Sequence, residues 1–124
     1  MSLGAHLSGV VGEQLATDYL IQKGYSVLAR NYRIKGGEID IIAQKGGDIV
    51  FVEVKLRASN RYGYPEEAVS YTKQKRVAKA IKFFLHTTRV RYSCVRFDII
   101  AITQSASDVT IIHIENVELN QSVC

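Results

Sequence analysis

Two segments rich in isoleucine and valine, separated by Gly46–Gly47, constrain the fold of this chain more than any other feature. They make up the stretch from Gly36 to Arg57. Runs of β-branched residues favour strands, and a glycine pair between two such runs is typical of a two-residue hairpin turn. The stretch therefore predicts an antiparallel β-hairpin whose turn is closed by Lys45 and Asp48.

Counting outward from this turn sets the register of the predicted hairpin. Asp40 then lies opposite Glu53, and Glu38 lies opposite Lys55. Side chains alternate between the two faces of a strand, so all four residues share one face. Two opposed carboxylates repel each other unless one takes up a proton or a cation lies between them. The alternative is a solvated face on which both carboxylates point into water.

The charged end of the hairpin predicts a divalent metal site at the rim of a core. Carboxylates on rigid strands suit Mg²⁺, which prefers a few carboxylates together with water and substrate phosphate. On the same face Ile42 lies opposite Phe51, so the turn end is expected to be buried. The opposite face is expected to be apolar throughout and covered by a helix; it comprises Ile39, Ile41, Ala43, Val50, Val52, Val54 and Leu56.

Length and composition are those of one globular domain spanning residues 1–124. The chain is 47% hydrophobic and 23% charged, with a net charge of +4, which is compatible with a polyanionic partner. Cys94 and Cys124 lack the spacing of a metal site or a disulfide framework. Because no segment has the length or pattern of a membrane span or a signal peptide, we expect a cytoplasmic protein without a membrane partner.

The rest of the chain predicts a simple order of elements around the hairpin. Apolar periodicity and turn signals place a helix, a strand, the hairpin, a loop, a second helix, two closing strands and a polar tail. The corresponding ranges are 5–24, 25–33, 36–57, 58–67, 70–86, 95–102, 109–114 and 115–124. Asp98 on the first closing strand is either a further acid near the site or an edge or capping residue.

Basic side chains gather on the elements expected around the acidic site, and they are candidates for contacts with a nucleic-acid backbone. Lys73 is aligned with the buried face of the second helix, so we expect its ammonium group to reach the carboxylates. For the others, ordinary solvated or edge positions are the alternative. The candidates are Arg30, Arg33, Arg57, Arg61, Lys73 and Arg76.

The order of elements and the position of the acids resemble the restriction-endonuclease-like fold of the PD-(D/E)xK nuclease superfamily. Asp40 followed by Glu53-Val54-Lys55 corresponds to its metal-binding motif, although Ile39 stands where the superfamily name has proline. The flanking residues are also similar to archaeal Holliday-junction resolvases. The resemblance implies an α/β fold with an αβββαβ core, a mixed five-stranded sheet and a helix on each face.

Across nearly the whole chain the sequence is most similar to the YraN-like family of bacterial proteins. The residues that support this resemblance are Gly12-Glu13 with Ala16, Arg30 to Arg33, the hairpin, Lys73 to Arg76, and Arg96 to Asp98.

The superfamily resemblance implies a role for each residue of the site. Asp40, Glu53 and the carbonyl of Val54 would hold Mg²⁺ or Mn²⁺, and Glu13 would support the metal or its waters. Lys55 would position or activate the attacking water. Because Glu38 opposite would favour its charged form, we expect Lys55 to act as a cation rather than as a base. Many nucleases of this fold are homodimers, so a dimer is a further expectation.

Three functions follow from these observations. The first is a magnesium-dependent nuclease that hydrolyses phosphodiester bonds in DNA, including branched or repair intermediates. The second is a nuclease-like module that binds nucleic acid without cutting it. The third is a protein-interaction domain with a vestigial site, against which the complete set of expected catalytic residue types argues. Metal binding and DNA cleavage distinguish the three.

Overall fold

The computed structural model describes residues 9–57, 70–105 and 107–119. It confirms the expected order of a helix, three strands, a helix and two strands. The elements are α1 (Gly9–Gln22), β1 (Ser26–Ile34), β2 (Gly37–Lys45), β3 (Asp48–Arg57), α2 (Tyr71–Thr87), β4 (Cys94–Gln104) and β5 (Val109–Ile114). The expected loop at 58–67 lies outside the described residues.

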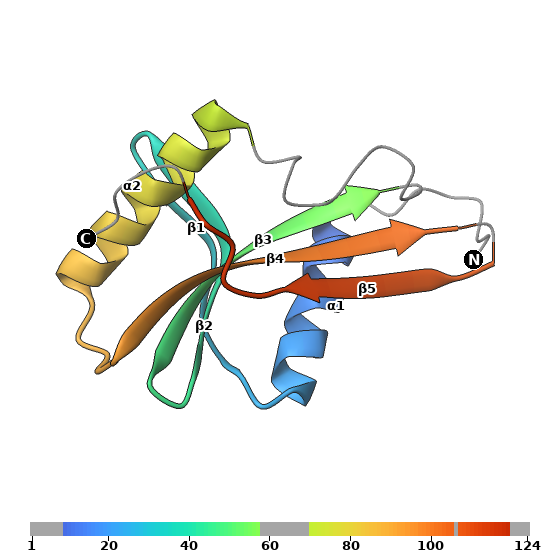
Figure 1. The fold of residues 1–124 in the computed structure, drawn as a ribbon, viewed down its shortest axis with the longest axis horizontal. Coiled ribbons are helices and arrows are strands. Elements are labelled where there is room, and N and C mark those ends of the chain that lie inside the picture. The colour runs from blue at the N-terminus through green and yellow to red at the C-terminus, as the bar shows by residue number, and fades with distance from the viewer. Residues whose placement is uncertain (1–8, 58–69, 106, 120–124) are drawn as a thin grey trace.

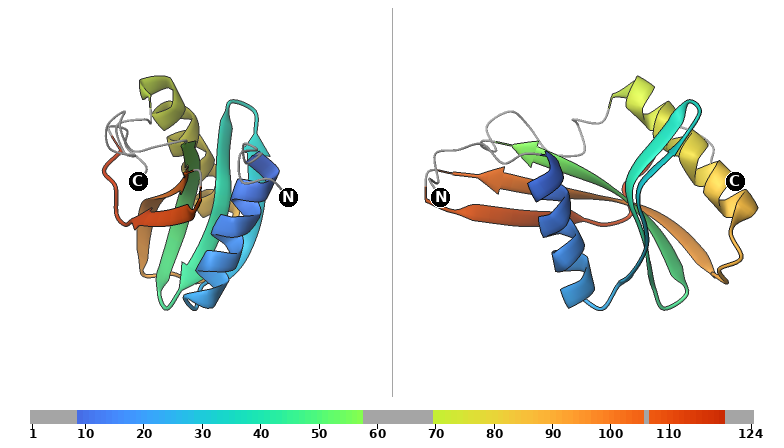
Figure 2. Two further views of the ribbon diagram at one scale, coloured as in Figure 1. Left: turned by 90° about the vertical axis from the view of Figure 1, so that its right-hand side faces the viewer. Right: turned by 180° about the vertical axis from the view of Figure 1, so that it is seen from behind.

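The five strands form one mixed sheet in the order β1-β2-β3-β4-β5. β3 and β4 run parallel, and the other neighbouring strands run antiparallel. The helices α1 and α2 pack on opposite faces of this sheet (Figures 1 and 2). The arrangement confirms the predicted restriction-endonuclease-like αβββαβ core. Within the described ranges, no helix has the length and apolar character needed to cross a membrane.

Each face of the sheet has its own apolar core beneath one helix. Under α2 the buried side chains include Ile42, Ile49, Phe51, Val77, Ile81, Phe97 and Ile99. Under α1 they include Ala16, Leu20, Ile41, Val50, Val52, Ile100 and Ile102. The central strands are therefore covered on both sides, which explains why their sequences are nearly continuous apolar runs.

The hairpin has the predicted turn and the predicted register over its first half. Lys45 pairs with Asp48, and Gly46 takes a φ of +59°, a conformation that glycine adopts without a steric penalty. The pairing continues outward as far as Ile41 and Val52. Beyond that pair β2 continues alongside β1 and β3 alongside β4, so the two strands of the hairpin diverge into a fork (Figure 1).

The strict alternation expected along β2 breaks at Asp40. Ile39 packs on the α2 side of the sheet, whereas Ile41 packs on the α1 side. The prediction that the two isoleucines share a face is therefore wrong. Asn31 lies on β1 at the same level, between the residues paired with Ile41 and Ile39, and it adopts a positive φ of 51°. The irregular backbone of β1 and the break in alternation along β2 thus occur at the same level of the sheet.

The residues just after β5 are anchored to the sheet, in contrast to the expected polar tail. The Val117 amide donates to the Phe97 carbonyl at 2.7 Å, and the Asn116 amide donates to Asp98 Oδ1 at 2.9 Å. Val117 and Leu119 pack against the core on the α2 side. Apolar contacts therefore hold residues 115–119, while residues 120–124 lie outside the described chain.

Candidate active site

The predicted acids meet where β2 and β3 diverge. The Val54 amide donates to Asp40 Oδ2 at 2.8 Å, so an acidic side chain takes the place of a backbone acceptor at the point where the ladder ends. In an extended strand the N–H and C=O of one residue point to the same side. The carbonyl of Val54 therefore also points into the fork. Glu53, the residue before Val54, is close enough for the charge of Asp40 to affect its pKa.

Glu53 is the most unusual residue of the site. It is 2% exposed, and its Oε2 lies 3.4 Å from the ammonium of Lys73. Its Oε1 is buried and has no hydrogen-bond partner in the described part of the chain. Burial, together with the nearby carboxylate of Asp40, raises the pKa of Glu53 to about 7 despite the opposing charge of Lys73. At neutral pH this carboxylate is half protonated and lacks a full set of partners.

The pKa of Asp40 is shifted in the same direction as that of Glu53. Burial raises its pKa, and the hydrogen bond from the Val54 amide opposes that shift without cancelling it. The carboxylate of Asp40 disfavours ionisation of Glu53, and that of Glu38 disfavours ionisation of Asp40. A divalent cation in the fork would reverse this balance for both carboxylates.

Lys73 links α2 to the acids. Ser70 caps α2 by accepting the Lys73 amide at 3.1 Å, which fixes the first turn. The Lys73 ammonium then lies 3.0 Å from Glu38 Oε1 as well as 3.4 Å from Glu53. Burial alone would lower the pKa of Lys73, but the carboxylates of Glu53 and Glu38 outweigh it and raise the pKa. The side chain reaches the carboxylates, as its helical position predicted.

Glu38 does not lie opposite Lys55, and that part of the predicted register is wrong. Because the hairpin forks at Asp40, Glu38 pairs along β1 with Arg33. Its side chain bonds to Lys73, and to Arg76 Nε at 3.4 Å. The hydrogen bond from Lys73 lowers the pKa of Glu38, so this acid is ionised and serves as the anchor of α2.

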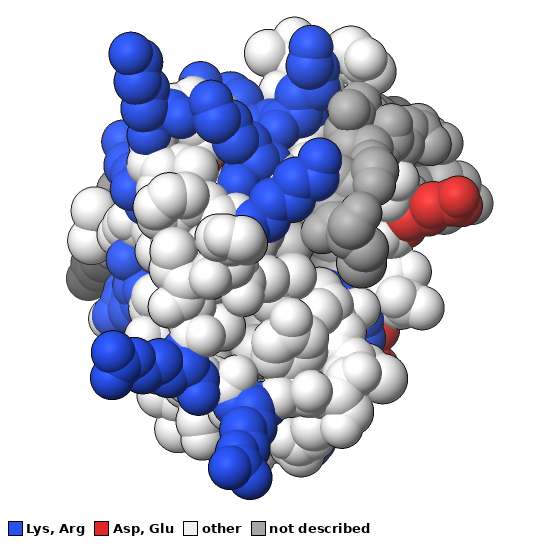
Figure 3. Space-filling view, turned by 90° about the vertical axis from the view of Figure 1, so that its left-hand side faces the viewer, with Lys and Arg blue, Asp and Glu red and all other residues white. Residues whose placement is uncertain are grey.

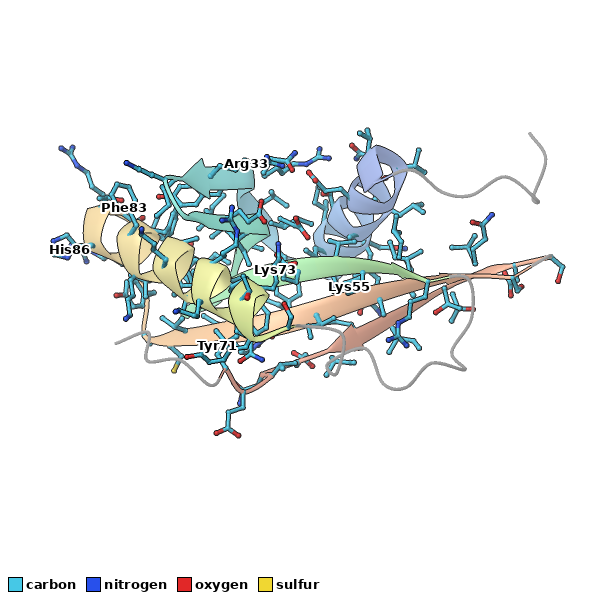
Figure 4. The ribbon with its side chains drawn as sticks, turned by 90° about the horizontal axis from the view of Figure 1, so that it is seen from above. Arg33, Lys55, Tyr71, Lys73, Phe83 and His86 are labelled. Carbon is cyan, nitrogen blue, oxygen red and sulfur yellow. The ribbon has the colours of Figure 1, made fainter. Side chains whose placement is uncertain are left out.

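Lys55 follows Glu53 on the same face of β3. It is half-buried, and its positive charge partly opposes the rise in the pKa of both Glu53 and Asp40. Figure 4 shows Lys55 on β3 and Lys73 reaching toward that strand from α2. Two ammonium groups from different elements therefore lie near the acids.

Glu13 faces the fork from the α1 side of the sheet. A cavity there is lined by Gly9, Val10, Glu13, Asn31, Arg33, Asp40, Val54 and Leu56. Within it Glu13 Oε1 accepts hydrogen bonds from Arg30 Nε at 3.2 Å and from Asn31 Nδ2 at 3.0 Å. Glu13 thus shares a cavity with Asp40 while its carboxylate is tied to β1.

The basic candidates differ in what they contact. Arg30 bonds Glu13 and Gln14, so it supports α1 rather than projecting freely. Arg33 is exposed and lines the cavity beside Asp40 (Figure 4). Arg57 is half-buried at the end of β3. Lys73 and Arg76 both bind Glu38. Arg61 lies outside the described residues.

A second polar cluster surrounds Asp98 on the α1 face, away from the fork. The buried Asp98 carboxylate binds Arg96 twice, His113 Nε2 at 2.7 Å and the Asn116 amide. Hydrogen bonds from His113 and Arg96 outweigh burial and lower its pKa. Asp98, His113 and Glu115 offer ligand atoms within 4.8 Å of one another, although protein donors already engage both Asp98 oxygens.

Sequence reasoning missed this cluster around Asp98. It lies apart from the metal-motif acids, and the amide contact fits the expected capping role. Its signal was the spacing of Arg96 and Asp98, which places both on one face of a strand.

Comparison with known proteins identifies a family. A model described as uncharacterised protein family UPF0102 matches residues 12–102. The chain is 47% identical over 116 residues to a UPF0102 protein of Geobacter metallireducens, covering 94% of this chain and 95% of the relative. It is 48% identical over 108 residues to one of Thermodesulfovibrio yellowstonii, covering 87% and 92%. These matches span all the residues of the fork.

Proposed function

This chain belongs to the uncharacterised protein family UPF0102, the YraN-like group, and we propose that it is a magnesium-dependent nuclease. The proposed reaction is hydrolysis of phosphodiester bonds in DNA, with branched or repair intermediates as the substrate class. The observation that supports this most strongly is the buried carboxylate of Glu53, one of whose oxygens has no hydrogen-bond partner among the described residues, near the half-buried Asp40.

The residues of the fork fit a divalent cation. Asp40, Glu53 and the Val54 carbonyl supply hard oxygen ligands from two rigid strands, which suits Mg²⁺ or Mn²⁺. Buried polar atoms in proteins nearly always have a hydrogen-bond partner, and Glu53 Oε1 has none among the described residues, so a cation is a fitting partner for it. A cation would supply that partner and would stabilise the ionised form of both acids.

The cation and the lysines have separate parts in the proposed chemistry. When bound, Mg²⁺ would polarise the scissile phosphate and make a water molecule more acidic. The Lys55 ammonium, on the same face as Glu53, would stabilise negative charge on the phosphate oxygens and orient the attacking water. Lys73 holds Glu53 and Glu38 in place, and Arg33 stands at the cavity beside Asp40, where a flanking phosphate would bind.

Cleavage assays test the proposal directly. Purified protein with Mg²⁺ or Mn²⁺ is incubated with branched, nicked and single-stranded DNA. We expect product from the wild type and a loss of at least about a hundredfold in Asp40→Asn and Glu53→Gln. Glu118→Gln, at an exposed glutamate, is the matched control and should cleave like the wild type. Product from all four proteins alike would indicate a contaminating nuclease and overturn the proposal.

One observation favours a second candidate, a module that binds nucleic acid without cleaving it. Lys73 already neutralises part of the charge on Glu53, as a cation would. In that case Glu53→Gln would retain nucleic-acid binding, and the wild type would bind it with a strong salt dependence and form no product. Magnesium-dependent product from the wild type alone would exclude this candidate.

A further inference from the structure

The outer face of α2 presents a row of alternating ring and cationic side chains. Tyr71, Lys75, Lys79 and Phe83 follow one another at intervals of four residues, so each neighbours the next along a row that winds gradually around the helix. Tyr71 is 63% exposed and Phe83 is 49% exposed, and both lysines are exposed. Figure 4 shows the two rings at opposite ends of the helix. We call these four residues the α2 row.

The charge of α2 is unusual for a helix. It contains no acidic residue, although acidic side chains are favoured in a first turn and cations are disfavoured there. Its basic side chains are Lys73, Lys75, Arg76, Lys79 and Lys82. Lysine and arginine side chains cover much of the molecule on the side that includes α2 (Figure 3). A helix with this composition is suited to an anionic partner.

A groove lies beside three residues of the α2 row. It is lined by Gly36, Tyr71, Thr72, Lys75, Arg76 and Lys79. Arg76 lines the groove and also bonds to Glu38 beside Lys73. A polyanion bound along the α2 row would therefore meet Arg76, which is bonded to Glu38 beside the proposed site. The Lys75 ammonium lies 5.5 Å from the centre of the Tyr71 ring, so a ligand can contact a positive charge and an aromatic ring at the same place.

We propose that the α2 row binds an unpaired, single-stranded segment of nucleic acid that leads to the active site. Exposed rings stack on bases, and bases are open to stacking only where they are unpaired, whereas lysines contact the phosphates between them. From Tyr71 to Phe83 the helix rises about 18 Å, the length of roughly five stacked nucleotides at about 3.4 Å each. This proposal rests on the proposed function, for which it specifies a substrate with a single-stranded arm.

Binding without divalent cations tests the row independently of cleavage. Fluorescence anisotropy in EDTA compares a labelled 12-nucleotide oligothymidylate with a 12-base-pair duplex. We expect the wild type to prefer the single strand, and Tyr71→Ala with Phe83→Ala to weaken that binding roughly tenfold or more. Lys75→Gln with Lys79→Gln should reduce the salt slope by about 1.4, because each phosphate contact on a single strand contributes about 0.7. Ile21→Ala and Lys45→Gln, both at exposed positions, are the matched controls.

The outcomes separate this inference from the proposed nuclease activity. Equal affinity of the wild type and the double alanine variant for the single strand would overturn the proposal that the α2 row binds it, even if the protein cleaves DNA. Equal loss of duplex binding would also overturn it, because that result indicates a general phosphate surface. Selective loss of single-strand binding would support the row, even if no cleavage is found.

Discussion

At the scale of single residues, the site is defined by two acids that the fold keeps in an unfavourable state. Glu53 is nearly inaccessible, and one of its oxygens lacks a partner among the described residues. Asp40 is beside it, and the pKa of each acid is raised. Stability alone would favour an apolar residue at position 53, which agrees with the proposal that this acid serves to bind a cation.

The raised pKa of Glu53 predicts how stability depends on pH. Between pH 4.5 and about 7 the unfolded chain releases this proton while the folded chain keeps it, so Glu53 destabilises the fold as the pH rises. The loss is up to about 1.4 kcal/mol per pH unit for one proton. We therefore expect Glu53→Gln to gain stability over the wild type between pH 4.5 and 7, with no further gain above pH 8. Urea unfolding at a series of pH values measures this, with Glu118→Gln as the control. A difference that does not vary with pH would contradict the buried-acid account.

Magnesium affinity should depend on the same proton. Because a metal binds the ionised carboxylate, affinity rises with pH until Glu53 is fully deprotonated. With a pKa of about 7, we expect the association constant to increase roughly tenfold from pH 6 to pH 8 and to level off above that. Calorimetric titrations at three pH values measure the change. An affinity that is constant over this range would place the binding site elsewhere.

At the scale of secondary-structure elements, close contact between α2 and β2 positions Lys73 beside the acids. A Cβ atom at Gly37 would lie 3.0 Å from the backbone of both Ala80 and Arg76, so α2 approaches β2 with no room for a side chain. The same contact brings Lys73 and Arg76 to Glu38. The glycine at this position therefore has a functional consequence as well as a packing one.

Substitution of Gly37 tests that contact. We expect Gly37→Ala to cost about 1–3 kcal/mol, because backbone atoms cannot yield as a flexible side chain can. We also expect α2 to move outward, which weakens the ion pairs of Glu38. Thermal unfolding measures the cost, and Gly9→Ala is the matched control because its Cβ would meet no atom within 4 Å. Equal stability of the two variants would show that the helix is not held at this distance.

The hairpin shows which parts of the site follow from sequence. Its turn and its inner register, as far as Ile41 and Val52, depend on local patterns, namely a glycine pair and alternating apolar residues. The fork does not, because it depends on how β2 pairs with β1 and β3 with β4. The orientation of the Lys73 side chain toward the acids could be predicted, because helical spacing aligned it with the buried face. Its sharing between Glu38 and Glu53 depends on the packing of α2 and could not be predicted.

At the scale of the whole molecule, the fold is a sheet that divides into two arms. One arm consists of β1 and β2, the other of β3, β4 and β5, and the acids lie at the point of division (Figures 1 and 2). The helix α1 contributes Glu13 from one face, and α2 contributes Lys73 from the other. Residues far apart in sequence are thus brought near one position between the arms. The matched UPF0102 model spans this whole assembly.

The most direct test of the account is a calorimetric titration of Mg²⁺ into the protein at pH 8. The wild type should bind one ion with measurable heat. The Asp40→Asn, Glu53→Gln double variant, which removes both charges with little change in size, should show no binding heat while remaining folded by circular dichroism. Equal heats from the two proteins, or no heat from the wild type, would contradict the claim that the forked hairpin is a metal site.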